Sequence, residues 1–118
     1  MARYMLLIPD DEKIWADLSD EEKSVVYGKH KEFSEALAAR GHEVVHAAEL
    51  APPSQARTVR LVDGRVQVTE GPYAEAAEQL SGYYVIDTPD VDDLVQVVGI
   101  LADAETGLEL RECLGGEQ

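Results

Sequence analysis

The 118-residue chain is predicted to fold as a single α+β domain, residues 1–118, with a ferredoxin-like split β-α-β arrangement and an inserted β-hairpin. Three observations predict this class. Strand and helix patterns follow one another as β-α-β, hairpin, β-α-β. The dipeptide Asp63-Gly64 marks the hairpin. Several strands are apolar on both faces, which two helices on one side of a sheet cannot cover.

The first β-α-β unit opens with a short apolar strand over Arg3–Ile8, which Pro9 is expected to end. Ser19 followed by Glu22 has the pattern of a capping box and predicts a helix start. The apolar face of this helix is predicted from side chains at helical spacing: Val26, His30, Phe33 and Leu37. Gly41 supplies the residue that ends the helix.

The hairpin has the clearest local signal in the chain. A strand over His42–Leu50 is broken by prolines, and two segments that alternate apolar and polar residues, Ala56–Val62 and Arg65–Thr69, then flank Asp63-Gly64. A two-residue turn places Leu61 opposite Val66 and Val59 opposite Val68 on one face.

The second β-α-β unit is expected to follow one or two helical turns over Ala74–Gln79. Its strand spans Gly82–Asp87, and Thr88-Pro89 is predicted to supply the N-cap and first residue of a helix. The helix has an apolar face made by Val91, Leu94, Val95, Val98 and Leu101. Gly107–Cys113 closes the sheet.

Apolar residues on both faces of the strands predict a second copy of the chain. In the first strand Tyr4, Leu6 and Ile8 point one way while Met5 and Leu7 point the other. The strand Tyr83–Ile86 is likewise apolar on both sides. A monomer rarely exposes so large an apolar patch, so we expect a homodimer that packs sheet against sheet and closes a barrel-like space.

Composition excludes several classes of function. There are 24 acidic and 10 basic residues, and the net charge of -14 disfavours binding to nucleic acid. No run of apolar residues has the length of a membrane span or a signal peptide, and Cys113 is the only cysteine. We therefore expect a cytoplasmic protein without a membrane anchor, disulfide or cofactor.

The segment from Thr69 to Tyr84, TEGPYAEAAEQLSGYY, resembles the signature Asp-Gly-Pro-Phe-Ala-Glu-Thr-Lys-Glu of the YCII-related family. The strands at Tyr4–Ile8 and Thr58–Arg60 also resemble that family, so the similarity spans nearly the whole chain. The resemblance implies a dimeric α+β barrel. It also implies either lyase-like chemistry, as in a few members, or association with extracytoplasmic-function sigma factors.

The chain departs from the family signature at four positions. Glu70 stands in place of aspartate, Tyr73 in place of phenylalanine, Ala77 in place of lysine and Ser81 in place of glycine. The missing lysine removes a cation beside the acidic residues of the motif. Chemistry that depends on this lysine is therefore not carried over.

Two residues are candidate proton carriers. Glu70 precedes a rigid Gly-Pro turn, which could direct its carboxylate into an apolar space; the alternative is a structural turn in which this glutamate caps a neighbouring backbone amide. His30 could shuttle protons near neutral pH or be a core histidine that is already hydrogen-bonded. Tyr73, Glu75 and Tyr83 are candidate substrate-binding residues, with core packing or solvation as the alternatives.

Two functions of different class remain open. One is a dimer that binds a small apolar organic molecule and carries out cofactor-free acid–base catalysis of the lyase or isomerase type. The other is a non-enzymatic ligand-binding or sigma-factor-associated regulatory protein. His42 and His46 are expected on one face of a strand, too far apart to share a metal, so no metal site is predicted. Motifs of nucleotide-binding proteins, serine hydrolases and zinc proteases are absent.

Overall fold

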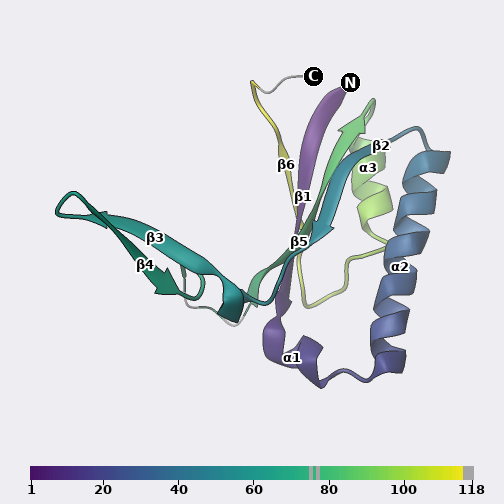
Figure 1. Ribbon diagram of the computed structural model, residues 1–118. Helices are drawn as coiled ribbons and strands as arrows, with labels where there is room; N and C mark the ends of the chain where they lie inside the picture. Colours follow the sequence, from purple (N-terminus) through teal and green to yellow (C-terminus); the bar gives the residue numbers. More distant parts are fainter. Residues whose placement is uncertain (75, 77, 116–118) are drawn as a thin grey trace.

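The computed structural model describes residues 1–74, 76 and 78–115. Within these ranges the chain forms three α-helices, one 3-10 helix and six strands (Figure 1). The helices are α1 (Glu12–Asp17), α2 (Asp20–Ala39), α3 (Val91–Val98) and the 3-10 helix η1 (Pro53–Gln55). The strands are β1 (Ala2–Asp11), β2 (Glu43–Glu49), β3 (Arg57–Val62), β4 (Arg65–Glu70), β5 (Glu78–Thr88) and β6 (Glu109–Glu112).

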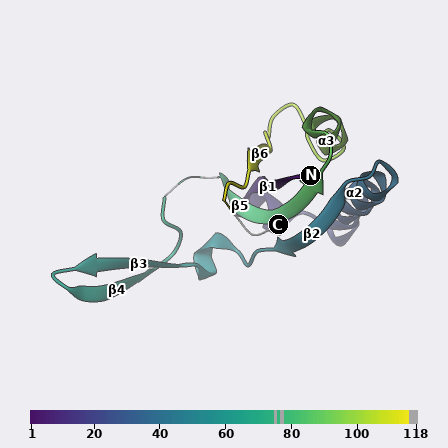
Figure 2. The same ribbon diagram turned by 90° about the horizontal axis from the view of Figure 1, so that it is seen from above.

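Four strands form an antiparallel sheet in the order β2-β5-β1-β6, and β3 and β4 form a separate two-stranded sheet. Both α2 and α3 lie on one side of the four-stranded sheet (Figures 1 and 2). The α+β class is therefore confirmed. Its strand order is compatible with the predicted ferredoxin-like arrangement, in which each helix connects two strands that flank a third.

The local signals for α2 and for the hairpin are confirmed. Ser19 accepts a hydrogen bond from the backbone of Glu22, whose carboxylate accepts one from the backbone of Ser19, and this completes the capping box. Gly41 follows the helix with a φ of 83°. In the hairpin, Asp63 and Gly64 both have positive φ, and Leu61 pairs with Val66 as predicted.

Two predictions for the second half were wrong. The helical turns expected over Ala74–Gln79 do not extend to Glu78 and Gln79, which begin β5 and pair with β1. Strand pairing across the sheet thus outweighed the helical preference of an alanine- and glutamate-rich segment. The N-cap of α3 is Asp90 instead of Thr88, because Thr88 still pairs with Ala2 as the last residue of β5.

The end of β1 also differs from the prediction. Pro9 does not stop the strand, because it lies at a register shift between Ile8 and Pro9 where the missing N–H is tolerated. Ser81 donates a side-chain hydrogen bond to the Ile8 carbonyl at 2.9 Å, so the irregular site remains satisfied. The strand then leads into α1, a helix that the sequence pattern did not reveal and that Asp11 caps.

The core lies between the sheet and the helices α2 and α3. Phe33 of α2 and Leu94 of α3 are fully buried, and the ring of Phe33 meets that of Tyr84 edge-on at 5.1 Å. The buried apolar residues are Leu6, Phe33, Leu37, Tyr84, Ile86, Leu94 and Val97. Because side chains alternate along a strand, Leu6 and Tyr84 point to the helices and their neighbours point to the opposite face.

Candidate functional site

The sheet face turned away from α2 and α3, here called the open face, has an apolar centre. Met5 of β1 lies opposite Val85 of β5, and Leu7 lies opposite Tyr83. These four side chains are only half-buried, because no element of the described chain packs over them as the helices do on the other side. The prediction that the two tyrosines point to opposite faces is confirmed, with Tyr84 under the helices and Tyr83 on the open face.

Polar groups surround this apolar centre. At one end, Arg3 and Asp87 are cross-strand partners, and the Arg3 guanidinium donates to both carboxylate oxygens at 2.7 and 3.0 Å. This hydrogen bonding by Arg3 lowers the pKa of Asp87. The outer strand β6 adds Glu109 opposite Leu7 and Arg111 opposite Met5, and these two charged residues form an ion pair.

The other outer strand places His46 beside Tyr83. The two rings are tilted with centroids 5.7 Å apart, and a bulge between Val44 and His46 brings the histidine opposite Val85. The open face thus carries an imidazole and a phenol next to apolar side chains. Such a pair can donate and accept hydrogen bonds with a small molecule at the centre of the face.

His30 does not lie on the open face. It is held between α2 and the sheet, where its Nδ1 is 2.7 Å from the Tyr84 hydroxyl and its ring stacks on that of Tyr84. Burial lowers the pKa of His30, and Glu49 partly opposes this effect. Burial also raises the pKa of Tyr84. The two side chains therefore favour a neutral hydrogen-bonded pair that lies between α2 and the sheet.

The acidic motif begins at the end of the separate β3–β4 hairpin, whereas His30 lies in α2 and His46 in β2. Glu70 ends β4 and is exposed, and Tyr73, in the turn that follows, is 85% exposed. Gly71 adopts a φ of 108°, which favours glycine, and its N–H donates to the Ala56 carbonyl at 2.7 Å. The predicted residue Glu75 lies outside the described residues. The structure therefore does not bring Glu70, His30 and Tyr83 together within one chain.

The Ser-Gly step after the motif has a clear structural role. A Cβ at Gly82 would meet the Ala48 carbonyl oxygen at 3.1 Å, so the close approach of β2 to β5 favours glycine at this position. Together with the Ser81 bond to β1, this step fixes the beginning of β5. It thereby positions Tyr83, the next residue, on the open face.

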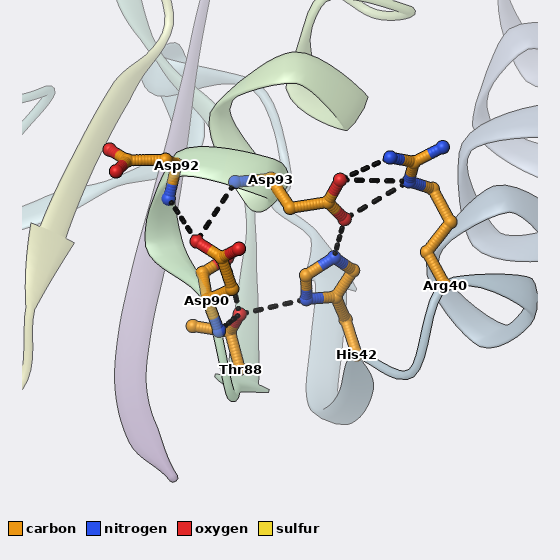
Figure 3. Close-up of polar contacts among 6 residues, drawn as sticks. All are labelled: Arg40, His42, Thr88, Asp90, Asp92 and Asp93. Atoms are coloured by element: carbon orange, nitrogen blue, oxygen red, sulfur yellow. Dashed lines mark hydrogen bonds and ion pairs between the residues drawn. The ribbon is translucent and has the colours of Figure 1, made fainter.

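A cluster of polar side chains joins α2 and α3 at the opposite end of the core (Figure 3). His42 is 2.8 Å from Thr88 Oγ1 through Nδ1 and 2.8 Å from Asp93 Oδ2 through Nε2. Arg40 also binds the Asp93 carboxylate, with Nε at 3.1 and 3.0 Å from its oxygens. Hydrogen bonds from Arg40 and then His42 hold the pKa of Asp93 well below its usual range.

The hydroxyl–imidazole–carboxylate order of Thr88, His42 and Asp93 resembles a catalytic relay, but the surroundings of the hydroxyl indicate a structural role. Thr88 is only 2% exposed, and its hydroxyl also contacts the backbone N–H and C=O of Asp90, each at 3.0 Å. A hydroxyl enclosed in this way has no path to a substrate. The adjoining depression has a volume of about 300 Å³ and is lined by Arg40, His42, Asp90 and Asp93. We therefore assign the cluster a structural role, in which it holds the end of α2 against α3.

The expected strand face shared by His42 and His46 is wrong. His42 precedes β2 and turns into the polar cluster, whereas His46 follows the bulge and lies on the open face. Among the described residues, no three His, Cys, Asp or Glu side chains are arranged to hold a metal. In the same residues no helix has both the length and the apolar character needed to span a membrane.

Sequence reasoning missed two of these features. His46 was considered only as a metal ligand. A signal for the open face on which it lies was available, because the strand that contains Tyr83 is apolar on both faces. The polar cluster had no local signal, since His42 is separated from Thr88 by 46 positions and from Asp93 by 51.

Comparison with known proteins agrees with the family resemblance of the sequence motif. A family model described as the YCII-related domain matches residues 2–114. An uncharacterized protein of Rhizobium meliloti (strain 1021) is 31% identical over 101 residues, which cover 86% of this chain and 81% of the relative. The name of that relative states no activity, so the similarity bears on family and not on reaction.

Proposed function

The chain belongs to the YCII-related family, and from this premise we propose that two copies pack open face to open face and bind a small, mostly apolar organic molecule between them. The observation that carries the proposal is the open face itself. Met5, Leu7, Tyr83 and Val85 form a continuous apolar centre that the helices of the same chain leave uncovered. Water contact with such a centre is unfavourable, and a second copy would remove it.

The surface area of the chain supports a partner. Its accessible surface is 8381 Å², whereas a compact monomer of 12.9 kDa exposes about 6,300 Å². The excess of about 2,000 Å² per chain falls within the range that stable homodimers bury on each subunit. A single subunit is therefore less compact than a protein of its size that functions alone.

The chemistry of the open face defines the class of ligand. Its apolar centre suits a flat or compact hydrocarbon framework, and the His46–Tyr83 pair suits one polar group on that framework. The ion pairs Arg3–Asp87 and Glu109–Arg111 satisfy most of the nearby charge internally. An uncharged or weakly polar organic molecule therefore fits this face better than a phosphate or other polyanion.

Sedimentation equilibrium at micromolar concentration tests the assembly. The native chain should sediment as a dimer, and Val85→Arg should sediment as a folded monomer, because it places a charge in the apolar centre. Val95→Arg is the matched control, since Val95 is 50% exposed on α3 and lies away from the open face. A native chain that remains monomeric, or a Val85→Arg variant that remains dimeric, would contradict the assembly.

Titration with the neutral apolar dye Nile red tests the binding. Saturable binding at a fixed number of dyes per dimer, with NMR shifts at the amides of Met5, Tyr83 and Val85, would support a ligand space. A dimer that binds no dye would show that the two faces pack against each other without a space. That result would exclude ligand binding and leave the dimer intact.

Acid–base catalysis is the second candidate, and one observation favours it. Glu70 lies on the same face of the hairpin as Val68 and Val66, because residues two apart in a strand share a face. Cover over that face would remove water from its carboxylate, which lies next to Val68 and opposite its cross-strand partner Arg57. Compounds that displace Nile red should be screened for turnover, and Glu70→Gln should keep displacement and lose turnover. A variant that turns over normally would exclude Glu70 as the proton carrier.

A further inference from the structure

The hairpin of β3 and β4, residues 57–70 and here called the arm, stands apart from the rest of the chain. Its strands pair only with each other, and both views show it extending away from α2 and α3 (Figures 1 and 2). The radius of gyration is 16.4 Å, whereas a compact chain of this length has about 13.5 Å. A two-stranded hairpin in water is marginally stable by itself, so its conformation calls for a partner surface.

The base of the arm fixes the direction in which it extends. The backbone N–H of Gly71 donates to the Ala56 carbonyl at 2.7 Å, and the Thr58 hydroxyl donates to the Gly71 carbonyl at 2.8 Å. In addition, Ser54 before the arm donates to Glu12 of α1 at 2.8 Å. These bonds tie both ends of the arm to each other and to the body. The arm is thus held out as a defined element.

The two faces of the arm differ in chemistry. One carries two cross-strand apolar pairs, here called the apolar ladder, whose side chains are 57–71% exposed: Val59 with Val68 and Leu61 with Val66. The other face carries polar pairs such as Arg60 with Gln67 and Thr58 with Thr69. This alternation is typical of a strand pair that is covered on one side and solvated on the other. In a single chain the apolar side has no cover.

Charge indicates that the cover is a second copy of this chain. The arm contains three arginines against two acidic residues, Asp63 and Glu70, whereas the whole chain has a net charge of -14. The resulting net charge of +1 on the arm favours contact with the acidic body of another copy. The same acidic body would oppose docking to nucleic acid or to an anionic membrane.

The position of the arm also indicates that a second copy of the chain covers it. The arm extends to the side of the sheet that the helices leave open, so a copy seated on the open face would lie beside it (Figure 2). The excess accessible surface of about 2,000 Å² per chain is large enough for one continuous interface that spans the open face and the apolar ladder. One occupant therefore accounts for the cover of both surfaces.

We infer that each arm lies against the partner subunit and completes the binding space of that subunit in trans. The apolar ladder of one chain packs at the edge of the space between the two open faces. Neither subunit then has a complete site alone, because one wall comes from the other chain. This inference rests on the proposed dimer but goes beyond it, since a face-to-face dimer can form with free arms.

A matched pair of arm variants tests the energetic contribution of the ladder. Leu61→Asp should weaken dimerisation about 10-fold or more in sedimentation equilibrium, because it places a charge on the covered face, and should reduce Nile red affinity. Gln67→Asp adds the same charge to the polar face of the same arm, so it reports the electrostatic part alone and should weaken both far less than Leu61→Asp does. Equal behaviour of the two variants would contradict the inference.

Paramagnetic relaxation enhancement tests the placement without disturbing the ladder. In a Cys113→Ser background, chains with a spin label at Arg60→Cys are mixed with isotope-labelled chains that carry no spin label. Broadening of the Met5, Tyr83 and Val85 amides in the isotope-labelled chain would show the arm in trans, and a label at Gln96→Cys on α3 should leave those amides sharp. A dimer without this broadening overturns the inference alone, whereas a monomer overturns both this inference and the proposed function.

Discussion

The two faces of the four-stranded sheet have the same type of side chain and opposite surroundings. Leu6 points to the helices and is fully buried, whereas Leu7 points to the open face and is half-buried. On the helix side, every buried polar side-chain atom of the described residues has a hydrogen-bond partner. The contrast teaches that one subunit completes its structure on one side only.

The difference extends to the histidines. His42 is enclosed by the polar cluster between α2 and α3, and His30 is bonded to Tyr84, so both serve the helix side. His46 lies on the open side next to Tyr83. Of these three rings, only that of His46 combines contact with the open face and freedom to bind a ligand. The predictions below test this division between the two sides.

The largest effect is expected for the adjacent leucines. Leu6→Ala should lower the free energy of unfolding by about 3–4 kcal/mol, because it leaves a cavity in a fully enclosed core. Leu7→Ala should cost about 1 kcal/mol or less in the subunit and should instead weaken dimerisation. Urea unfolding at several protein concentrations separates the two effects. Equal, concentration-independent losses would show that both faces belong to a core within one chain.

The next effect concerns two histidines near β2. His42→Ala should lower the free energy of unfolding by about 2–3 kcal/mol, because it removes a buried ring that is hydrogen-bonded at both nitrogens. His46→Ala should change it by about 0.5 kcal/mol or less, since this ring is exposed. Thermal and urea unfolding provide the measurement. A large loss for His46→Ala would assign that residue to the core and not to a binding face.

A pair of glycines contrasts α2 with the base of the arm. Gly28→Ala should raise the free energy of unfolding by about 0.5–1 kcal/mol, because Gly28 is helical and a Cβ there would meet nothing within 4 Å. Gly71→Ala should lower it by about 1–2 kcal/mol, because its φ of 108° is strained for alanine. Opposite signs in urea unfolding are the expected result, and equal signs would contradict the geometry of the turn.

The smallest effect is a dependence on pH that arises on the helix side. Burial lowers the folded-state pKa of His30, so the unfolded chain binds a proton more readily than the folded one. The contribution of the neutral ring is full above the ordinary histidine pKa of about 6.5 and is lost as the pH falls toward the folded value. Urea unfolding between pH 7.5 and 5 should show this decline, and His30→Gln should reduce its slope. An unchanged slope would exclude His30 as the source.

Much of the fold could be predicted because its signals are local. The turn at Asp63-Gly64 set the register of the hairpin, and the Ser19–Glu22 pair set the start of α2. The failures arose where long-range pairing competes with local preference. Glu78 and Gln79 joined β5 because β1 extends far enough to pair with them, which no pattern inside residues 74–79 could reveal.

The candidate site was predicted less completely, for a related reason. Tyr83 was correctly placed on the face opposite Tyr84, because alternation is a property of the strand itself. The assignment of faces needed the path of α2 and α3. The same path brought His30 to Tyr84 on the helix side, whereas Glu70 ends β4 in the arm.

By itself, the sequence determined the capping box of α2, the hairpin and the presence of apolar residues on both faces of β1 and β5. Backbone sterics and hydrogen bonds between near neighbours decide these features, so a few residues suffice to encode them. Only the tertiary structure decided that Leu7 and Tyr83 face away from the helices and that His42 meets Asp93 across 51 positions. Such contacts depend on where distant segments pack, and packing is settled by the whole chain.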